Sequence, residues 1–195
     1  TCTEAGSITV TCSRCDYKTV TEIPALGHDY VNGVCQLCGD KEVIEGFFED
    51  VLPGTFCFDA VKWAVDNKVT NGVKDGIFAP SNTVTRGQIV TFLWRAAGCP
   101  EAENTAVEFS DVKDTAFYAK AVAWAVEEGI TKGVGNGKFA PESVCTRGQI
   151  VTFLWRFMGE PEATKDVEFT DVVPGAFYAN AVAWAVEAGV TTGIT

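Results

Sequence analysis

Cysteine and histidine side chains with metal-ligand spacing gather in the first 40 residues of the chain. Two Cys-x-x-Cys pairs are separated by 19 residues, a spacing typical of a zinc ribbon, in which four thiolates surround one Zn²⁺. This spacing predicts a structural zinc site made of Cys12, Cys15, Cys35 and Cys38. An alternative set offers three thiolates and one imidazole, from Cys2, Cys12, Cys15 and His28. Disulfides remain open as the non-metal alternative, and an exported protein would favour them.

Nucleophilic catalysis is disfavoured by the same residue types. His28 is the only histidine, so at most one His-dependent site exists, and a Cys–His pair in a short, turn-rich module would lack a pocket. Polar residues in the rest of the chain recur at fixed intervals instead of forming one asymmetric site. We therefore expect a module that is not an enzyme.

Two arginines are the best candidates for binding an anion. Arg86 and Arg147 each follow a threonine at the start of an expected helix, beside backbone N–H groups and the positive end of the helix dipole. A guanidinium there can bind a carboxylate with two hydrogen bonds, and the glycine that follows each arginine leaves room for close approach. The structural alternative is that each arginine pairs with a nearby aspartate, Asp50 or Asp111.

These candidates belong to a repeated pattern that begins at about residue 46. The segment TRGQIVTFLWR at residues 85–95 returns unchanged at 146–156. Three further residue types recur at spacings of 61 and 60 residues, namely Asp50, Asp111 and Asp171, then Trp63, Trp124 and Trp184, then Gly72, Gly133 and Gly193. The chain therefore contains two complete repeats and the opening of a third.

Each repeat is expected to form two helices around a glycine-rich turn. The first helix of the second repeat is expected at residues 117–128, where alanine is abundant and Gly129 provides a stop. The second helices are expected at 85–97 and 146–157, and each begins with a capping box of Thr and Gln. In the first 45 residues, short β-type runs at 7–11 and 18–21 predict a small strand-and-turn module that needs a covalent or metal staple.

Simple structural roles are available for the other repeated residues. Trp63 and Trp124 lie within alanine- and valine-rich helices, so they are most simply core residues, with stacking against a sugar as the alternative. The aspartate of each F-x-D-V motif is predicted to close a turn before the first helix.

The repeated unit resembles the S-layer homology repeat of bacterial surface proteins. The resemblance covers about residues 46–195 and rests on the motifs F-x-D-V, A-V-x-W-A-V, G-[IV]-T-x-G, G-x-F-x-P and T-R-G-Q-[IV]-V-T-F-L-W-R. It implies three repeats in an α-helical, pseudo-threefold domain that binds acidic, commonly pyruvylated, cell-wall polysaccharide. The family signature T-R-A-E reads T-R-G-Q here, which keeps the capping box but removes a carboxylate.

The resemblance also implies which residues bind the glycan. The sugar-binding arginine of the family matches Arg86 and Arg147, and less directly matched positions are Asp50, Asp111, Trp63, Trp124, Gly72 and Gly133. In this family the second helix of one repeat packs with the first helix of the next. We therefore expect helix 85–97 to pair with 117–128, and helix 146–157 to pair with 177–188. The head looks like a short Cys/His repeat of exported bacterial proteins, which brings no known activity.

Charge and hydropathy exclude several classes of partner. The net charge is −11, from 15 basic and 26 acidic side chains, so the overall field repels nucleic acid and anionic lipid. The longest apolar run, residues 121–126, is too short to cross a bilayer, so no membrane insertion is expected. The chain shows no signal peptide and is expected to be a fragment of a longer protein.

Together these features predict a mainly α architecture with a small zinc-ribbon-like module at its N-terminus. The expected domains are residues 1–45 for that module, and 46–105, 106–165 and 166–195 for three repeats, the third truncated. The expected function is extracellular anchoring to the bacterial cell wall or S-layer through grooves between repeats, with no cofactor needed by the repeats. The alternative is a structural protein that assembles with itself into a layer or fibre.

The truncated third repeat predicts one unpaired helix. Helix 56–66 would lack the helix that packs on its apolar face, formed by Phe58, Val61 and Val65. We expect two glycan grooves instead of three, and a homo-oligomer contact through helix 56–66.

Overall fold

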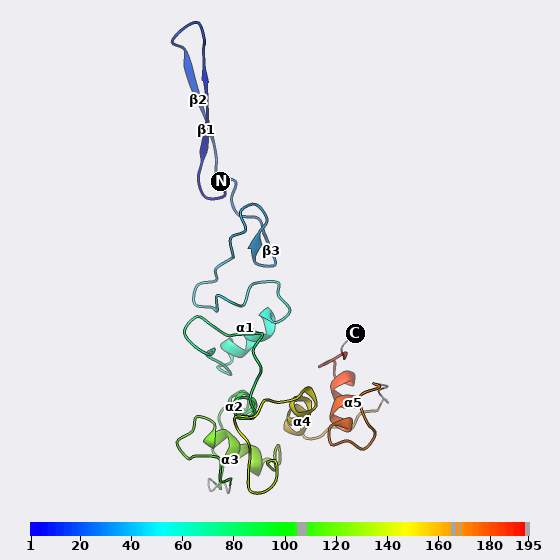
Figure 1. Ribbon diagram of the computed structural model, residues 1–195. Coiled ribbons are helices and arrows are strands. Elements are labelled where there is room, and N and C mark those ends of the chain that lie inside the picture. The colour runs from blue at the N-terminus through cyan, green and yellow to red at the C-terminus, as the bar shows by residue number, and fades with distance from the viewer. Residues whose placement is uncertain (105–108, 165–166, 168, 194–195) are drawn as a thin grey trace. The chain divides into compact units, whose positions relative to one another are not determined.

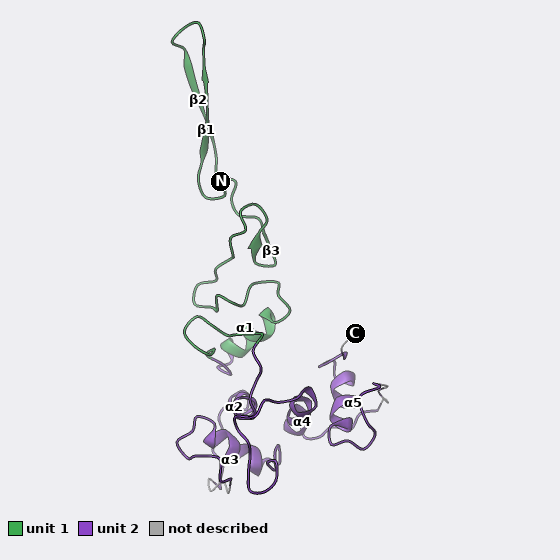
Figure 2. Cartoon of the chain, in the orientation of Figure 1, with its two compact units in different colours: residues 1–66, 71–81 green, residues 67–70, 82–195 purple. Residues whose placement is uncertain are grey.

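A computed structural model describes residues 1–104, 109–164, 167 and 169–193 of the chain (Figure 1). It divides into two units, drawn in different colours in Figure 2. Unit 1 comprises residues 1–66 and 71–81, and unit 2 comprises residues 67–70 and 82–195. Among the described residues, none of the helices has the length and apolar character needed to cross a membrane.

Two antiparallel hairpins form the first 35 residues of unit 1. Strands β1 (Gly6–Thr11) and β2 (Lys18–Ile23) pair along their full length, and β3 (Tyr30–Val31) pairs with β4 (Val34–Cys35). The predicted strands are confirmed. Asn32 and Gly33, both with positive φ, make the two-residue turn between β3 and β4.

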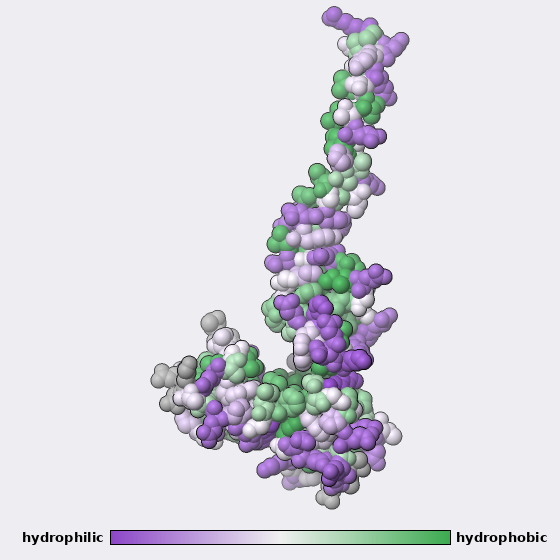
Figure 3. All heavy atoms as spheres, turned by 180° about the vertical axis from the view of Figure 1, so that it is seen from behind, coloured by the Kyte–Doolittle hydropathy of each residue, from purple (hydrophilic) through white to green (hydrophobic). Residues whose placement is uncertain are grey.

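The first hairpin has no core of its own. Apolar side chains on it stay more than half exposed, including Ile8, Val10 and Val20, and Figure 3 shows such side chains at the surface. A two-stranded hairpin with exposed faces is marginal in water. Stability of this region must come from another kind of interaction.

The first repeat lies largely within unit 1 and contributes α1 (Phe58–Asp66) to it. The prediction of an uncovered face made of Phe58, Val61 and Val65 was wrong. Val61 is buried, and the ring of Phe58 packs edge-to-face on that of Phe47, with centroids 5.4 Å apart. The chain just before the helix therefore helps to cover this face, and the exposed aromatic residues are Phe56 and Trp63.

The described residues of unit 2 form four helices, α2 (Arg86–Ala96), α3 (Ala119–Glu127), α4 (Arg147–Phe157) and α5 (Ala179–Glu187). Helix α2 packs on α3 and α4 packs on α5, which confirms the expected pairing of successive repeats, and α2 also contacts α4. Both capping boxes are present. The side chains of Thr85 and Thr146 accept a hydrogen bond from the backbone N–H of the glutamine three residues later, and that glutamine side chain accepts one from the backbone N–H of the threonine.

The main core of unit 2 lies between the first and second repeats. It contains Val90, Val122, Ile130, Phe139 and Phe153, each at most 4% exposed. Trp124 is 5% exposed and joins this cluster, which confirms its core role.

Candidate functional site

The start of each second helix packs directly on the tyrosine that precedes the first helix of the next repeat. A Cβ atom added at Gly87 would lie 2.8 Å from Cδ1 of Tyr118, and one at Gly148 would lie 3.1 Å from Cδ1 of Tyr178. The space beside each glycine is therefore filled by a tyrosine ring. The arginine that precedes each glycine therefore lies at a junction between two repeats. The first junction is formed by α2 and α3, and the second by α4 and α5.

At the first junction, Arg86 is a buried structural residue. Only 5% of it is exposed, its Nε donates to the carbonyl of Phe139 at 2.8 Å, and its guanidinium lies over the rings of Phe139 and Phe153. Burial lowers the pKa of Arg86, and the Asp111 carboxylate opposes this shift. The alternative role, a salt bridge to Asp111, is absent among the described residues, because a carbonyl and two aromatic faces take its place.

The backbone N–H groups at the start of α2 are also occupied. The N–H of Arg86 donates to Ser143 and that of Gly87 donates to Pro141, at 2.9 and 2.8 Å. Both carbonyls belong to the loop of the next repeat, which the sequence analysis did not identify as a partner. The recurring Pro of G-x-F-x-P marks this loop, but its distance from Arg86 depends on the fold.

The repeated aspartates hold the glycine-rich loop of their own repeat. Asp50 accepts from the N–H groups of Phe78 and Ala79, and Asp111 accepts from those of Phe139 and Ala140, all within 2.9 Å. The prediction of a local turn was therefore wrong, because the donors lie 28 and 29 residues later.

Gly72 and Gly133 have structural roles in this arrangement. Both have positive φ, and a Cβ at either would collide with a backbone carbonyl and with a phenylalanine ring. Glycine is needed there for the loop to close against the phenylalanine of the F-x-D-V motif.

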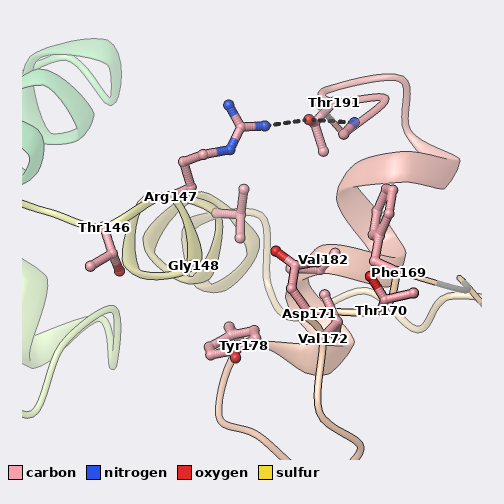
Figure 4. Close-up of a pocket in the computed structure, with 12 residues that line it drawn as sticks. Thr146, Arg147, Gly148, Phe169, Thr170, Asp171, Val172, Tyr178, Val182 and Thr191 are labelled. Atoms are coloured by element: carbon pink, nitrogen blue, oxygen red, sulfur yellow. Dashed lines mark hydrogen bonds between the residues drawn. The ribbon is translucent and has the colours of Figure 1, made fainter. Parts of the chain in front are cut away.

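The second junction differs from the first because Arg147 is exposed and lines a pocket of about 720 Å³ (Figure 4). Its Nη2 donates to Oγ1 of Thr191 at 3.1 Å. The pocket is also lined by Thr170, Asp171 and Tyr178. Within the described part of the chain, no backbone carbonyl accepts from the N–H of Arg147.

The repeated tryptophans are in different environments. Trp124 is buried in the core, whereas Trp63 is 56% exposed. Helix α3, which carries Trp124, packs against α2, and the ring of Trp124 lies edge-to-face on Phe157.

Four candidate metal ligands converge near the start of the chain. The ligand atoms of Cys2, His28, Cys35 and Cys38 all lie within 4.8 Å of one another. Burial raises the pKa of Cys35, but N–H groups of Cys38 and Leu37 and the His28 side chain together lower it to about 6. This cluster can bind a metal ion.

Neither predicted metal set is brought together. Cys12 and Cys15 lie in the turn between β1 and β2, whereas Cys2 lies beyond the other end of the hairpin. Six residues of strand separate the two ends by about 20 Å. The two β-type runs that flank Cys12 and Cys15 could have revealed this separation from the sequence.

The chain matches the family model described as S-layer homology domain at residues 47–90, 108–151 and 168–195, which is more than half of its length. It is 35% identical over 121 residues to a surface-layer 125 kDa protein of Lysinibacillus sphaericus, covering 60% of this chain and 10% of that protein. It is 34% identical over 109 residues to an endoglucanase of a Bacillus species, covering 56% of this chain and 11% of the enzyme.

A cellulosome-anchoring protein of Acetivibrio thermocellus is 28% identical over 103 residues, which covers 50% of this chain and 23% of that protein. The chain therefore spans less than a quarter of the length of each of these relatives. The first two matched segments each contain a first helix, an aspartate-held loop and a capping box, and the third contains α5. The chain belongs to the S-layer homology domain family.

Proposed function

We propose that this chain is a non-catalytic anchoring module that binds acidic cell-wall polysaccharide at the junctions between repeats. The observation that carries the proposal is the exposed Arg147, at the start of α4, beside a pocket of about 720 Å³. A pyruvate ketal on the glycan supplies the carboxylate that a guanidinium binds best.

The pocket combines groups that suit a charged sugar. The guanidinium of Arg147 and the N–H at the start of α4 attract the carboxylate, even though the whole chain carries a net charge of −11. The hydroxyl of Thr170 and the carboxylate of Asp171 can accept hydrogen bonds from sugar hydroxyls, and the ring of Tyr178 offers an apolar face.

Arg86 contributes to binding at the first junction in a more restricted way. Only its Nε has a hydrogen bond, to Phe139, and no described side-chain nitrogen is both buried and without a partner. Because only 5% of Arg86 is exposed, we expect it to hold the junction together rather than to bind the carboxylate directly. Asp111 and Gly133 support this site because they hold the loop that carries Phe139, and direct sugar contacts are not needed from them. Asp50 and Gly72 hold the corresponding loop of the first repeat.

Family membership and the relatives indicate an extracellular location at the bacterial cell wall, as the sequence predicted. The named relatives include a surface-layer protein and a cellulosome-anchoring protein, which supports attachment to the cell surface. The endoglucanase shares only 11% of its length with this chain, so the shared part supports anchoring and not hydrolysis.

The test is binding to purified cell-wall polysaccharide before and after mild acid removes its pyruvate ketals. Arg147→Ala should weaken binding to the pyruvylated glycan by about tenfold or more, since a charge-assisted hydrogen bond is worth about 1.5 to 3 kcal/mol. Arg14→Ala removes the same charge from the hairpin turn of the head and should bind like the parent chain.

Equal binding by Arg147→Ala and the parent chain would exclude this site. Loss of binding by Arg14→Ala to the same degree would show that net charge, and not the junction, governs attachment. Equal binding to the glycan before and after ketal removal would exclude the pyruvyl carboxylate as the recognised group.

Self-assembly into a layer or fibre is the second candidate function. One observation favours it, because Phe56 and Trp63 are 95% and 56% exposed near α1. A homo-oligomer would bury them against a second copy. Sedimentation without glycan should then show polymers that grow with concentration and disappear in Trp63→Lys, whereas one small species at all concentrations excludes this function.

A further inference from the structure

We propose that Cys2, His28, Cys35 and Cys38 bind one structural zinc ion. This site is independent of the proposed glycan binding, because all four residues belong to unit 1 and the Arg147 pocket belongs to unit 2. Three thiolates and one imidazole form a complete tetrahedral set for Zn²⁺, with no open position for catalysis.

Two distances within the cluster match the edges of a zinc tetrahedron, and all four ligand atoms lie within 4.8 Å of one another. Zn–S bonds of about 2.3 Å place two sulfurs about 3.8 Å apart, and a Zn–N bond of about 2.0 Å places nitrogen about 3.5 Å from sulfur. The Sγ atoms of Cys2 and Cys35 are 3.8 Å apart, and Sγ of Cys38 is 3.4 Å from Nδ1 of His28.

A disulfide explains the cluster less well than a metal. A disulfide brings two sulfurs to about 2.05 Å, uses two of the three cysteines and has no role for histidine. Here a histidine nitrogen and three sulfurs converge, and the His28 ring is oriented by stacking on Tyr30, with centroids 5.2 Å apart.

The backbone positions all four ligands. The N–H of Gly27 donates to the carbonyl of Cys2 at 3.0 Å, which brings His28 beside the N-terminus. Cys35 and Cys38 form a tight turn in which Gly39, with φ of 79°, donates to the carbonyl of Cys35 at 2.9 Å.

The cluster takes the place of a hydrophobic core in the head. Cys2 and Cys35, at 7% and 2% exposed, are the only residues with side chains that are buried in residues 1–45. A module of this size with exposed apolar side chains needs a staple, and zinc supplies it by joining the two hairpins.

The site also holds the head against the first repeat within unit 1. The turn at Gly33, two residues before Cys35, approaches the chain so closely that a Cβ there would lie 2.8 Å from Cβ of Leu52. The metal therefore fixes the turn that contacts the start of the repeat.

The test is metal analysis of the full chain, expressed with zinc and purified without chelator. We expect one zinc per chain, which Cys35→Ser reduces at least tenfold. The matched control Cys12→Ser/Cys15→Ser removes the hairpin-turn pair and should keep one zinc, so loss of zinc from this control would overturn the proposal.

X-ray absorption of the parent chain covers the case in which Cys35→Ser fails to fold. The expected shell has three sulfurs at about 2.3 Å and one nitrogen at about 2.0 Å. A shell of four sulfurs, or a chain without zinc whose free thiols number fewer than eight, would overturn the proposal. A metal-free chain with all thiols reduced that also fails to bind added zinc or Co²⁺ would do so as well.

Discussion

The two junctions of unit 2 start from the same eleven residues and place their arginines in different environments. At α2/α3, Arg86 is covered by Phe139 and Phe153, and the first N–H groups of the helix bond to the next repeat. At α4/α5, Arg147 is exposed beside a pocket and bonds to Thr191.

At the first junction, the loop of the next repeat supplies the groups that cover the arginine. This loop carries Phe139 across Arg86. The motif therefore determines the helix and its cap, and the next loop determines what the arginine contacts. An arginine is ready for a ligand only where that loop leaves its terminal nitrogens accessible.

Phe139→Ala should disrupt the first junction and should lower the free energy of unfolding more than any other variant proposed here. The side chain is fully buried under Arg86, and a deletion of this kind lowers the free energy of unfolding by about 3 to 5 kcal/mol. Urea unfolding followed by tryptophan fluorescence would measure it. A loss below about 1 kcal/mol would mean that this ring is not a central part of the core.

Arg86→Ala and Arg147→Ala should show directly that the two arginines contribute differently to stability. We expect Arg86→Ala to lower the free energy of unfolding by about 2 to 3 kcal/mol, because it removes a buried charge-assisted bond and two ring contacts. Arg147→Ala should change it by less than about 0.5 kcal/mol, as is usual for an exposed residue. Equal losses in urea unfolding would contradict the comparison.

Gly87→Ala and Gly148→Ala should differ in their effect on stability, because the tyrosine beside each glycine is buried to a different degree. The new methyl group presses on the buried Tyr118 at 2.8 Å, so Gly87→Ala should lower the unfolding free energy by about 1 kcal/mol or more. Tyr178 is only half-buried and can shift, so the gain in helix propensity should leave Gly148→Ala near neutral. Thermal unfolding of both variants decides this, and a reversed order would count against tight packing at the first junction.

Asp111→Asn should have a modest effect at pH 7 and should change the pH dependence of stability. Burial raises the pKa of Asp111, but the N–H groups of Phe139 and Ala140 outweigh it and hold the pKa below the usual value. A lowered folded-state pKa gives stability that is present above about pH 4 and is lost as pH falls toward that lowered value.

We expect Asp111→Asn to lower the unfolding free energy at pH 7 by about 1 kcal/mol and to flatten its dependence between about pH 4 and 2. The matched control is Asp171→Asn, because no N–H donors equivalent to those of Phe139 and Ala140 reach Asp171 in the described residues. Urea unfolding across this pH range measures both variants, and the same pH dependence in parent and Asp111→Asn would show that the carboxylate does not hold the loop.

The sequence by itself determined the repeats, the helices and their caps. These depend on local chemistry, since Thr85 and Gln88 are three residues apart and the periodic apolar residues lie on one helix. The pairing of α2 with α3 also followed, through the resemblance of the repeats to a known family. The core role of Trp124 was predicted from its alanine-rich helix.

Only the tertiary structure decided which candidate ligands lie close together and which side chains are buried. Arg86 meets Phe139 across 53 residues, and Asp111 meets the loop 28 residues later, so no local pattern reveals either contact. The metal cluster depended on the length of one hairpin, which carries Cys12 and Cys15 away from Cys2 and leaves His28 beside Cys38. Residue type and spacing specify what a side chain can bind, whereas the path of the backbone specifies which side chains meet.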